Sequence, residues 1–98
     1  MDDDQAVLAA SELFKALSSP ARLNLLRLLA AGPAGVGELV ERTGMSQPLV
    51  SQHLRTLRTA GLAVVTRSGR EAIYSIADRH VMHVVEDALV HVREEGAA

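Results

Sequence analysis

The chain has 98 residues, of which 48% are hydrophobic and 22% charged, so we expect a single globular domain over residues 1–98 and exclude disorder. The absence of cysteine excludes disulfides, thiolate metal sites and thiol redox sensing. No apolar run has the length of a membrane span, and the acidic start at residues 2–4 is unlike a signal peptide, so we expect a cytoplasmic protein without a membrane partner. Phe14 and Tyr74 are the two aromatic residues available to fill the core. Because so short a chain with few large side chains buries a limited share of its surface alone, we expect an oligomer.

Helical spacing of apolar residues predicts two helices in the first third of the chain. The first covers about residues 5–17 and ends at Ser-Ser-Pro, residues 18–20. The same three residues begin the second helix, because a serine can cap it and proline suits the first turn. This second helix covers about residues 21–30 and ends at the Gly-Pro pair that follows.

Two further helices joined by a glycine turn predict a helix-turn-helix over about residues 36–60. The shorter helix covers about residues 36–42 and ends at Gly44, a residue type that adopts the left-handed conformation of many helix ends. Ser46 caps the longer helix, residues 47–60, whose apolar residues recur at positions i, i+4 and i+7. Its polar side chains are therefore expected to face outward.

Beyond residue 61 the apolar pattern becomes that of extended strands. Residues 62–66 and 72–76 flank Ser68-Gly69 and predict a hairpin, with Arg67 and Arg70 on either side of its tip. A basic hairpin after a helix-turn-helix is a wing, which we place at about residues 62–76. With a last helix over about residues 78–95, the expected fold is mainly α with a small β-hairpin, a winged helix-turn-helix in the order α-α-α-α-β-β-α.

Charge is unevenly distributed along the chain. Residues 1–41 carry six acids and three bases, whereas residues 42–70 carry five arginines and no acid. This middle segment suits a polyanion such as double-stranded DNA. A structural hydrogen bond is an equal alternative for His53, and solvated surface residues are the alternative for the whole set. The candidates are Arg55, Arg58, Arg67 and Arg70 for phosphate, and Gln47, Ser51, Gln52 and His53 for base edges.

Three stretches resemble those of a known family. They are residues 17–22 (LSSPAR), residues 45–54 (MSQPLVSQHL) and residues 69–74 (GREAIY). Through them the chain resembles the ArsR/SmtB family of metal-responsive winged-helix repressors over nearly its whole length. The resemblance implies a homodimer joined through its first and last helices. It also implies that two recognition helices enter successive major grooves of an operator with an imperfect inverted repeat, and that bound metal weakens this binding.

The last helix contains Asp78-x-His80 and His91-x-x-Glu94, the spacing of the metal-sensing site in the family that the chain resembles. His80 and His91 are eleven residues apart, about 16 Å along a helix, whereas donors to one zinc ion lie within about 4 Å of one another. One chain cannot close such a site. Pairing His80 with His91 and Asp78 with Glu94 of a second, antiparallel copy places the two-fold axis near residues 85–86 for both pairs. We therefore predict two equivalent sites, each built from both protomers.

Two imidazoles and two carboxylates suit Zn(II), with Co(II) or Ni(II) as alternatives. His83 is either a further ligand or a structural residue. A rival site within one chain would use His83, Asp87 and His91 at successive turns. The cysteine site of the family that the chain resembles is missing, because residues 38–41 contain no thiolate.

We therefore expect a metal-responsive transcriptional repressor that binds operator DNA as a homodimer and is released by Zn(II) bound between the paired last helices. The alternatives are a regulator of the same fold that senses no metal, a switch of the opposite sign, and a protein-interaction dimer without DNA binding. No enzyme is expected, because no phosphate-binding glycine loop, HExxH motif or nucleophile with its base is present. The apolar contacts between the paired helices are expected from Val81, Val84, Val85, Ala88, Leu89 and Val92.

Overall fold

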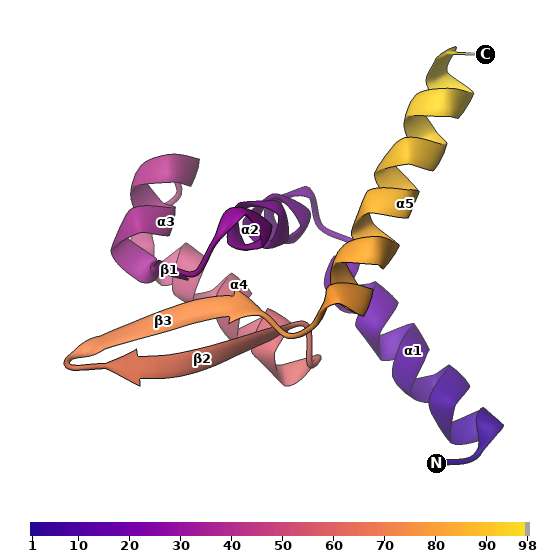
Figure 1. The fold of residues 1–98 in the computed structure, drawn as a ribbon, viewed down its shortest axis with the longest axis horizontal. Coiled ribbons are helices and arrows are strands. Elements are labelled where there is room, and N and C mark those ends of the chain that lie inside the picture. The colour runs from indigo at the N-terminus through magenta and orange to yellow at the C-terminus, as the bar shows by residue number, and fades with distance from the viewer. Residues whose placement is uncertain (98) are drawn as a thin grey trace.

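A computed structural model describes residues 1–97 and has the predicted winged helix-turn-helix architecture (Figure 1). Over these residues, no helix is both long and apolar enough to cross a membrane. A two-residue strand, β1, is present in addition to the predicted elements. The elements are α1 (Asp3–Leu17), α2 (Pro20–Ala31), β1 (Ala34–Gly35), α3 (Val36–Thr43), α4 (Gln47–Thr59), β2 (Ala63–Ser68), β3 (Glu71–Ile76) and α5 (Arg79–Ala97).

Side-chain caps determine where several helices begin. Asp2 and Gln5 form a reciprocal pair, in which the Gln5 N–H donates to Asp2 Oδ1 at 2.8 Å and the Asp2 N–H donates to Gln5 Oε1 at 3.0 Å. This pair starts α1 two residues before the predicted position. The hydroxyls of Ser19 and Ser46 accept the N–H three residues further on, at 3.2 and 3.3 Å, and so begin α2 and α4 as predicted.

The core is aliphatic. Phe14, which we expected to fill it, is 56% exposed, because α1 buries only its last residues, Ala16 and Leu17, in the core. Tyr74 is half-buried and packs against the core cluster. The predicted apolar face of α4 is confirmed, since its three side chains are fully buried. The side chains with almost no exposed surface are Leu25, Leu26, Leu39, Val50, Leu54, Leu57, Leu62 and Val85.

The sheet has the order β1-β3-β2 and is antiparallel throughout. Strand β1 pairs with the middle of β3, so that Ala34 lies opposite Tyr74 and Gly35 lies opposite Ile73. Because Gly35 is also the N-cap of α3, this pairing joins the start of the helix-turn-helix to the middle of the wing. The wing is therefore anchored half-way along β3.

The tip of the wing is one residue further along than the sequence predicted. Ser68 pairs with Glu71, so the two-residue connection is Gly69 and Arg70 rather than Ser68 and Gly69. Gly69 has a φ of 62°, a left-handed conformation that favours glycine. Arg70 thus lies in the turn itself.

The last helix packs partly against its own protomer. Val81 and Val85 are 8% and 1% exposed, and Leu89 packs on the core cluster, so these three are not free to pair with a second copy as we expected. The reason is that α5 covers α2 with one stripe of its surface. The neighbouring stripe stays exposed. Together, α1 and α5 form the end of the molecule opposite the wing tip (Figure 1). The α5 residues that remain exposed for pairing are Val84, Ala88 and Val92.

Candidate nucleic-acid interface and metal-binding helix

The turn between α3 and α4 is held by local hydrogen bonds. The Thr43 hydroxyl donates to the Leu39 carbonyl at 2.7 Å and accepts the Met45 N–H at 3.2 Å. Gly44 between them has a φ of 76° and ends α3 in the left-handed conformation, as predicted. This turn sets the direction in which α4 leaves α3.

Helix α4 displays most of the predicted DNA-binding side chains on its surface. Its buried stripe fixes the rotation of the helix, and the polar residues Gln47, Gln52, Arg55 and Arg58 are exposed as a result. Ser51 is half-buried. The structure therefore brings the predicted phosphate and base candidates together along one helix.

The wing adds Arg67, in β2, and Arg70, in the turn, and both are exposed. Neither these two arginines nor Arg55 and Arg58 form an ion pair with any side chain that the structure describes. Among the described side chains, none therefore neutralises their charge through an ion pair. Glu71, which follows Arg70, places one acid beside the basic tip.

His53, like Ser51, is less accessible than the other candidates. It is half-buried, and its Nδ1 lies 3.4 Å from a terminal nitrogen of Arg22. Burial, and after it the charge of Arg22, lowers the pKa of His53 below its ordinary value of about 6.5. His53 thus makes a hydrogen-bonded contact within the fold, which is the alternative role that the sequence allowed for this residue. The sequence alone indicates no role for Arg22, although this residue lies in residues 17–22, one of the three stretches that carry the family resemblance.

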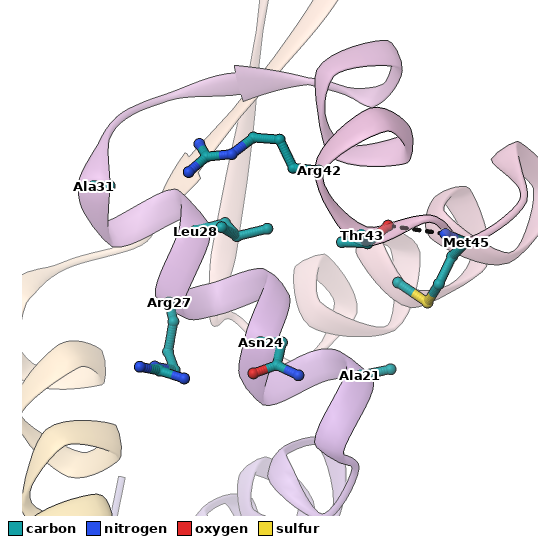
Figure 2. Close-up of a pocket in the computed structure, with 8 residues that line it drawn as sticks. All are labelled: Ala21, Asn24, Arg27, Leu28, Ala31, Arg42, Thr43 and Met45. Carbon is teal, nitrogen blue, oxygen red and sulfur yellow. Dashed lines mark hydrogen bonds between the residues drawn. The ribbon is translucent and has the colours of Figure 1, made fainter.

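A depression of about 650 Å3 lies between α2 and α3 (Figure 2). Arg42 extends from α3 toward α2 and is 3.6 Å from the carboxylate of Glu38. The lining contains no histidine and no carboxylate, so the depression offers a divalent cation no preferred ligand. The lining residues are Ala21, Asn24, Arg27, Leu28, Ala31, Arg42, Thr43 and Met45.

The predicted metal ligands lie at the two ends of α5. Near its start, Asp78 Oδ1 is 3.6 Å from His80 Nδ1 and also accepts the Val81 N–H at 3.1 Å, which makes Asp78 the cap of the helix. The side chain of His80 is 82% exposed. His91 and Glu94 are exposed near the other end of the same continuous helix.

No three histidine, aspartate or glutamate side chains among those described are placed to hold one ion. The rival site within one chain, built from His83, Asp87 and His91, is therefore not assembled in the structure. Asp78 and His80 form half of the predicted donor set. A carboxylate and an imidazole are ligand types that zinc prefers. The other half is too far along α5 to join it.

An apolar groove of about 220 Å3 lies between α1 and α5. It is lined by Phe14 and Leu17 from α1 and by Val84 and Ala88 from α5. Phe14 and Val84 are 56% and 39% exposed, which is unusual for large apolar side chains that sit side by side. The groove and the metal half-site thus share helix α5.

Helix α4 with its Ser46 cap stands in the place of the recognition helix. Together with the glycine turn before it and the basic hairpin after it, it defines a winged helix-turn-helix protein of the DNA-binding type. Residues 19–64 match the family model of the bacterial regulatory proteins of the arsR family. The chain is 42% identical over 89 residues to the HTH-type transcriptional regulator NmtR of Mycobacterium tuberculosis, which covers 91% of the chain and 74% of NmtR. The chain belongs to the arsR family.

Two further proteins are closely similar. The HTH-type transcriptional repressor SmtB of Mycobacterium tuberculosis is 45% identical over 87 residues, or 89% of the chain, and the chain spans 64% of the length of that repressor. The solution structure of the homodimeric winged helix-turn-helix DNA-binding domain of Mb0332 from Mycobacterium bovis, a possible ArsR-family regulator, superimposes with a TM-score of 0.87 at 31% identity. That match covers 97% of the chain and 90% of the Mb0332 fragment. The relatives named here are transcription regulators rather than enzymes.

Proposed function

We propose that this chain is a cytoplasmic transcriptional repressor that binds double-stranded operator DNA as a homodimer and is released by a divalent metal ion, Zn(II) in the first place. The observation that carries the DNA part is the set of four exposed arginines on α4 and the wing, none of which is paired with an acid among the described residues. Phosphate contacts from such arginines supply affinity, and polar side chains of the recognition helix supply sequence preference. We assign Arg55, Arg58, Arg67 and Arg70 to phosphate, and Gln47, Ser51, Gln52 and His53 to base edges.

The homodimer is supported by the exposed apolar groove of α1 and α5. Burying Phe14 and Val84 against a second copy would remove the exposed parts of two large apolar side chains from water. Burial of a fully exposed side chain of this kind is worth about 1.5–3 kcal/mol, and the dimer would gain the share that corresponds to the exposed part. Two-fold symmetry would place two copies of α4 on one face, and the operator would therefore be an inverted repeat.

The metal site is proposed to form across the dimer. Asp78 and His80 of one protomer would bind the ion together with His91 and Glu94 of the second. The same four donors also suit Co(II) and Ni(II) as alternative ions. Bound metal supplies a link between the two copies of α5. By holding them in one arrangement, it would change the spacing of the two recognition helices and so weaken their match to the operator.

Salt titration of operator binding tests the DNA assignment. We expect Arg55→Ala to weaken binding by about tenfold and to reduce the slope of log affinity against log salt by about two, because the homodimer loses one phosphate contact in each protomer. Arg27→Ala is the matched control, since Arg27 is an exposed arginine of α2 outside the basic segment. The measurement is fluorescence anisotropy of a labelled promoter fragment. Equal salt slopes for the two variants would contradict the assignment.

A mixing experiment tests the metal site. His80→Ala and His91→Ala are each expected to bind DNA normally but to lose the zinc response. In a mixed dimer of the two variants, one of the two sites regains both histidines, so mixing should restore zinc binding at one ion per mixed dimer. The rival site within one chain, built from His83, Asp87 and His91, does not use His80, so it would keep the zinc response in His80→Ala alone, and mixing would create no new site.

The control for this experiment is His83→Ala, which removes a histidine from the same helix. Retention of the zinc response would make His83 a structural residue, and its loss would add His83 to the ligand set. Operator affinity that does not change at saturating zinc would favour a regulator of this fold that senses no metal. Failure to retard any promoter fragment at low salt would favour a protein-interaction dimer.

A further inference from the structure

The connection between α1 and α2 contains a carbonyl that its own helix cannot satisfy. In an α-helix the carbonyl of Ala16 would accept the N–H of residue 20, but that residue is Pro20, which has no N–H. Ala16 is only 5% exposed, so water is a poor substitute. The Nε of Arg22 donates to this carbonyl at 2.6 Å and replaces the missing donor.

The same guanidinium reaches the recognition helix. One terminal nitrogen of Arg22 donates to the carbonyl of Lys15 at 3.5 Å, and the other lies 3.4 Å from Nδ1 of His53 in α4. A guanidinium has only donors, so Nδ1 must be the acceptor and the proton of a neutral His53 must sit on Nε2. Arg22 therefore connects the end of α1, the first turn of α2 and the middle of α4.

Given the proposed function, in which α1 forms the dimer and α4 enters DNA, we propose that Arg22 is the positioning residue that holds α4 in a fixed orientation relative to α1. The contact through His53 Nδ1 transmits the placement of α1 to the recognition helix. It also leaves Nε2–H as the only donor that the imidazole can offer to a phosphate or to a guanine edge.

This connection requires a neutral imidazole. A protonated His53 has no acceptor at Nδ1 and would place a second cation against Arg22. Burial and Arg22 hold the pKa of His53 below its ordinary value, so the contact persists at neutral pH. On α1, Glu12 is paired with Lys15 at 3.2 Å, and the charged residue that lines the same depression from α4 is Arg55. Neither offers His53 an unpaired acid that would favour its protonation.

Nuclear magnetic resonance of the imidazole nitrogens tests the contact without DNA. In the native chain we expect the Nε2–H tautomer of His53 and a pKa below about 6.5. Arg22→Gln should shift the pKa upward toward that value and populate both tautomers. Arg27→Gln removes the same charge from the same helix and should change neither quantity. An unchanged His53 in Arg22→Gln would overturn the proposal.

Operator affinity measured against pH tests the positioning role. At pH 7.5 we expect Arg22→Gln to bind about tenfold more weakly than Arg27→Gln, a loss within the usual range for residues that couple two elements. Arg22→Lys keeps the charge but not the fork of donors and should not restore affinity. We expect the native chain to lose operator affinity on acidification, as His53 becomes protonated. His53→Asn supplies an acceptor near the place of Nδ1 and cannot be protonated, so it should abolish this loss.

These measurements separate the possible failures. If Arg22→Gln changes His53 but binds the operator as tightly as Arg27→Gln, the positioning role is wrong. If the native chain binds no DNA at any salt concentration, the proposed function fails, whereas the nitrogen spectra still decide whether the contact exists. Thermal unfolding of Arg22→Gln and Arg22→Lys establishes that both variants are folded.

Discussion

The carboxylate of Asp78 has two roles, as the N-cap of α5 and as a proposed metal ligand. Its Oδ1 accepts the Val81 N–H at the start of α5 and also lies 3.6 Å from His80 Nδ1. An N-cap needs only an oxygen that accepts a hydrogen bond, which an amide also has. An anionic metal ligand needs the negative charge of the carboxylate. The two roles can therefore be separated by substitution.

We predict that Asp78→Ala lowers the free energy of unfolding by about 1 kcal/mol, the usual value for a lost N-cap. Asp78→Asn keeps the cap, so its stability should be close to that of the native chain, but its zinc affinity should fall because a charged ligand is lost. Urea unfolding in chelator and zinc titration measure the two effects. Native zinc affinity in Asp78→Asn would remove Asp78 from the ligand set.

Single residues also show what the sequence could and could not predict. The exposed arginines of α4 follow directly from the period of its apolar residues, and the distance between His80 and His91 follows from the rise of a helix. The role of Arg22 does not, because it depends on a contact between residues 31 positions apart. Pro20 was nevertheless a signal, since it leaves a carbonyl of α1 without its usual donor.

At the scale of elements, the helices were predictable because caps, glycines and apolar spacing are local properties. Strand β1 was not, because Ala34 and Gly35 have no strand pattern and become a strand only by pairing with β3. The wing tip was misplaced by one residue for a related reason. The register of a hairpin depends on which pairs close it, and Ser68 pairs with Glu71.

The turn at the wing tip and helix α3 each contain a glycine, and replacing these two glycines by alanine should change the free energy of unfolding in opposite directions. Gly69→Ala should lower the free energy of unfolding by about 1 kcal/mol, because φ is 62° there and the cost is conformational, with no atom within 4 Å of the added carbon. Gly37→Ala, inside α3 and equally open, should raise it by about 0.5–1 kcal/mol. Chemical denaturation of both variants is the measurement. A stabilised Gly69→Ala would contradict the observed turn.

At the scale of the whole molecule, the exposed apolar surface of α1 and α5 predicts that the chain is a dimer. Phe14→Asp should give a folded monomer, because it places a charge in the groove between these helices without touching the buried core. Light scattering measures the mass and circular dichroism the helix content. Val64→Asp, at an apolar residue of β2 that is 44% exposed, is the matched control and should remain dimeric.

The short pairing of β1 with β3 also divides the hairpin into two mechanical parts. Tyr74 and Ile73 are backed by a third strand, whereas Glu71 and Ala72 are joined only to β2. The outer part is a two-stranded ribbon that can bend or be lengthened while the inner part stays rigid. Two residues inserted before Gly69 and two inserted after Arg70 should thus extend the reach of the ribbon along a duplex and leave the packing of α3 as it is.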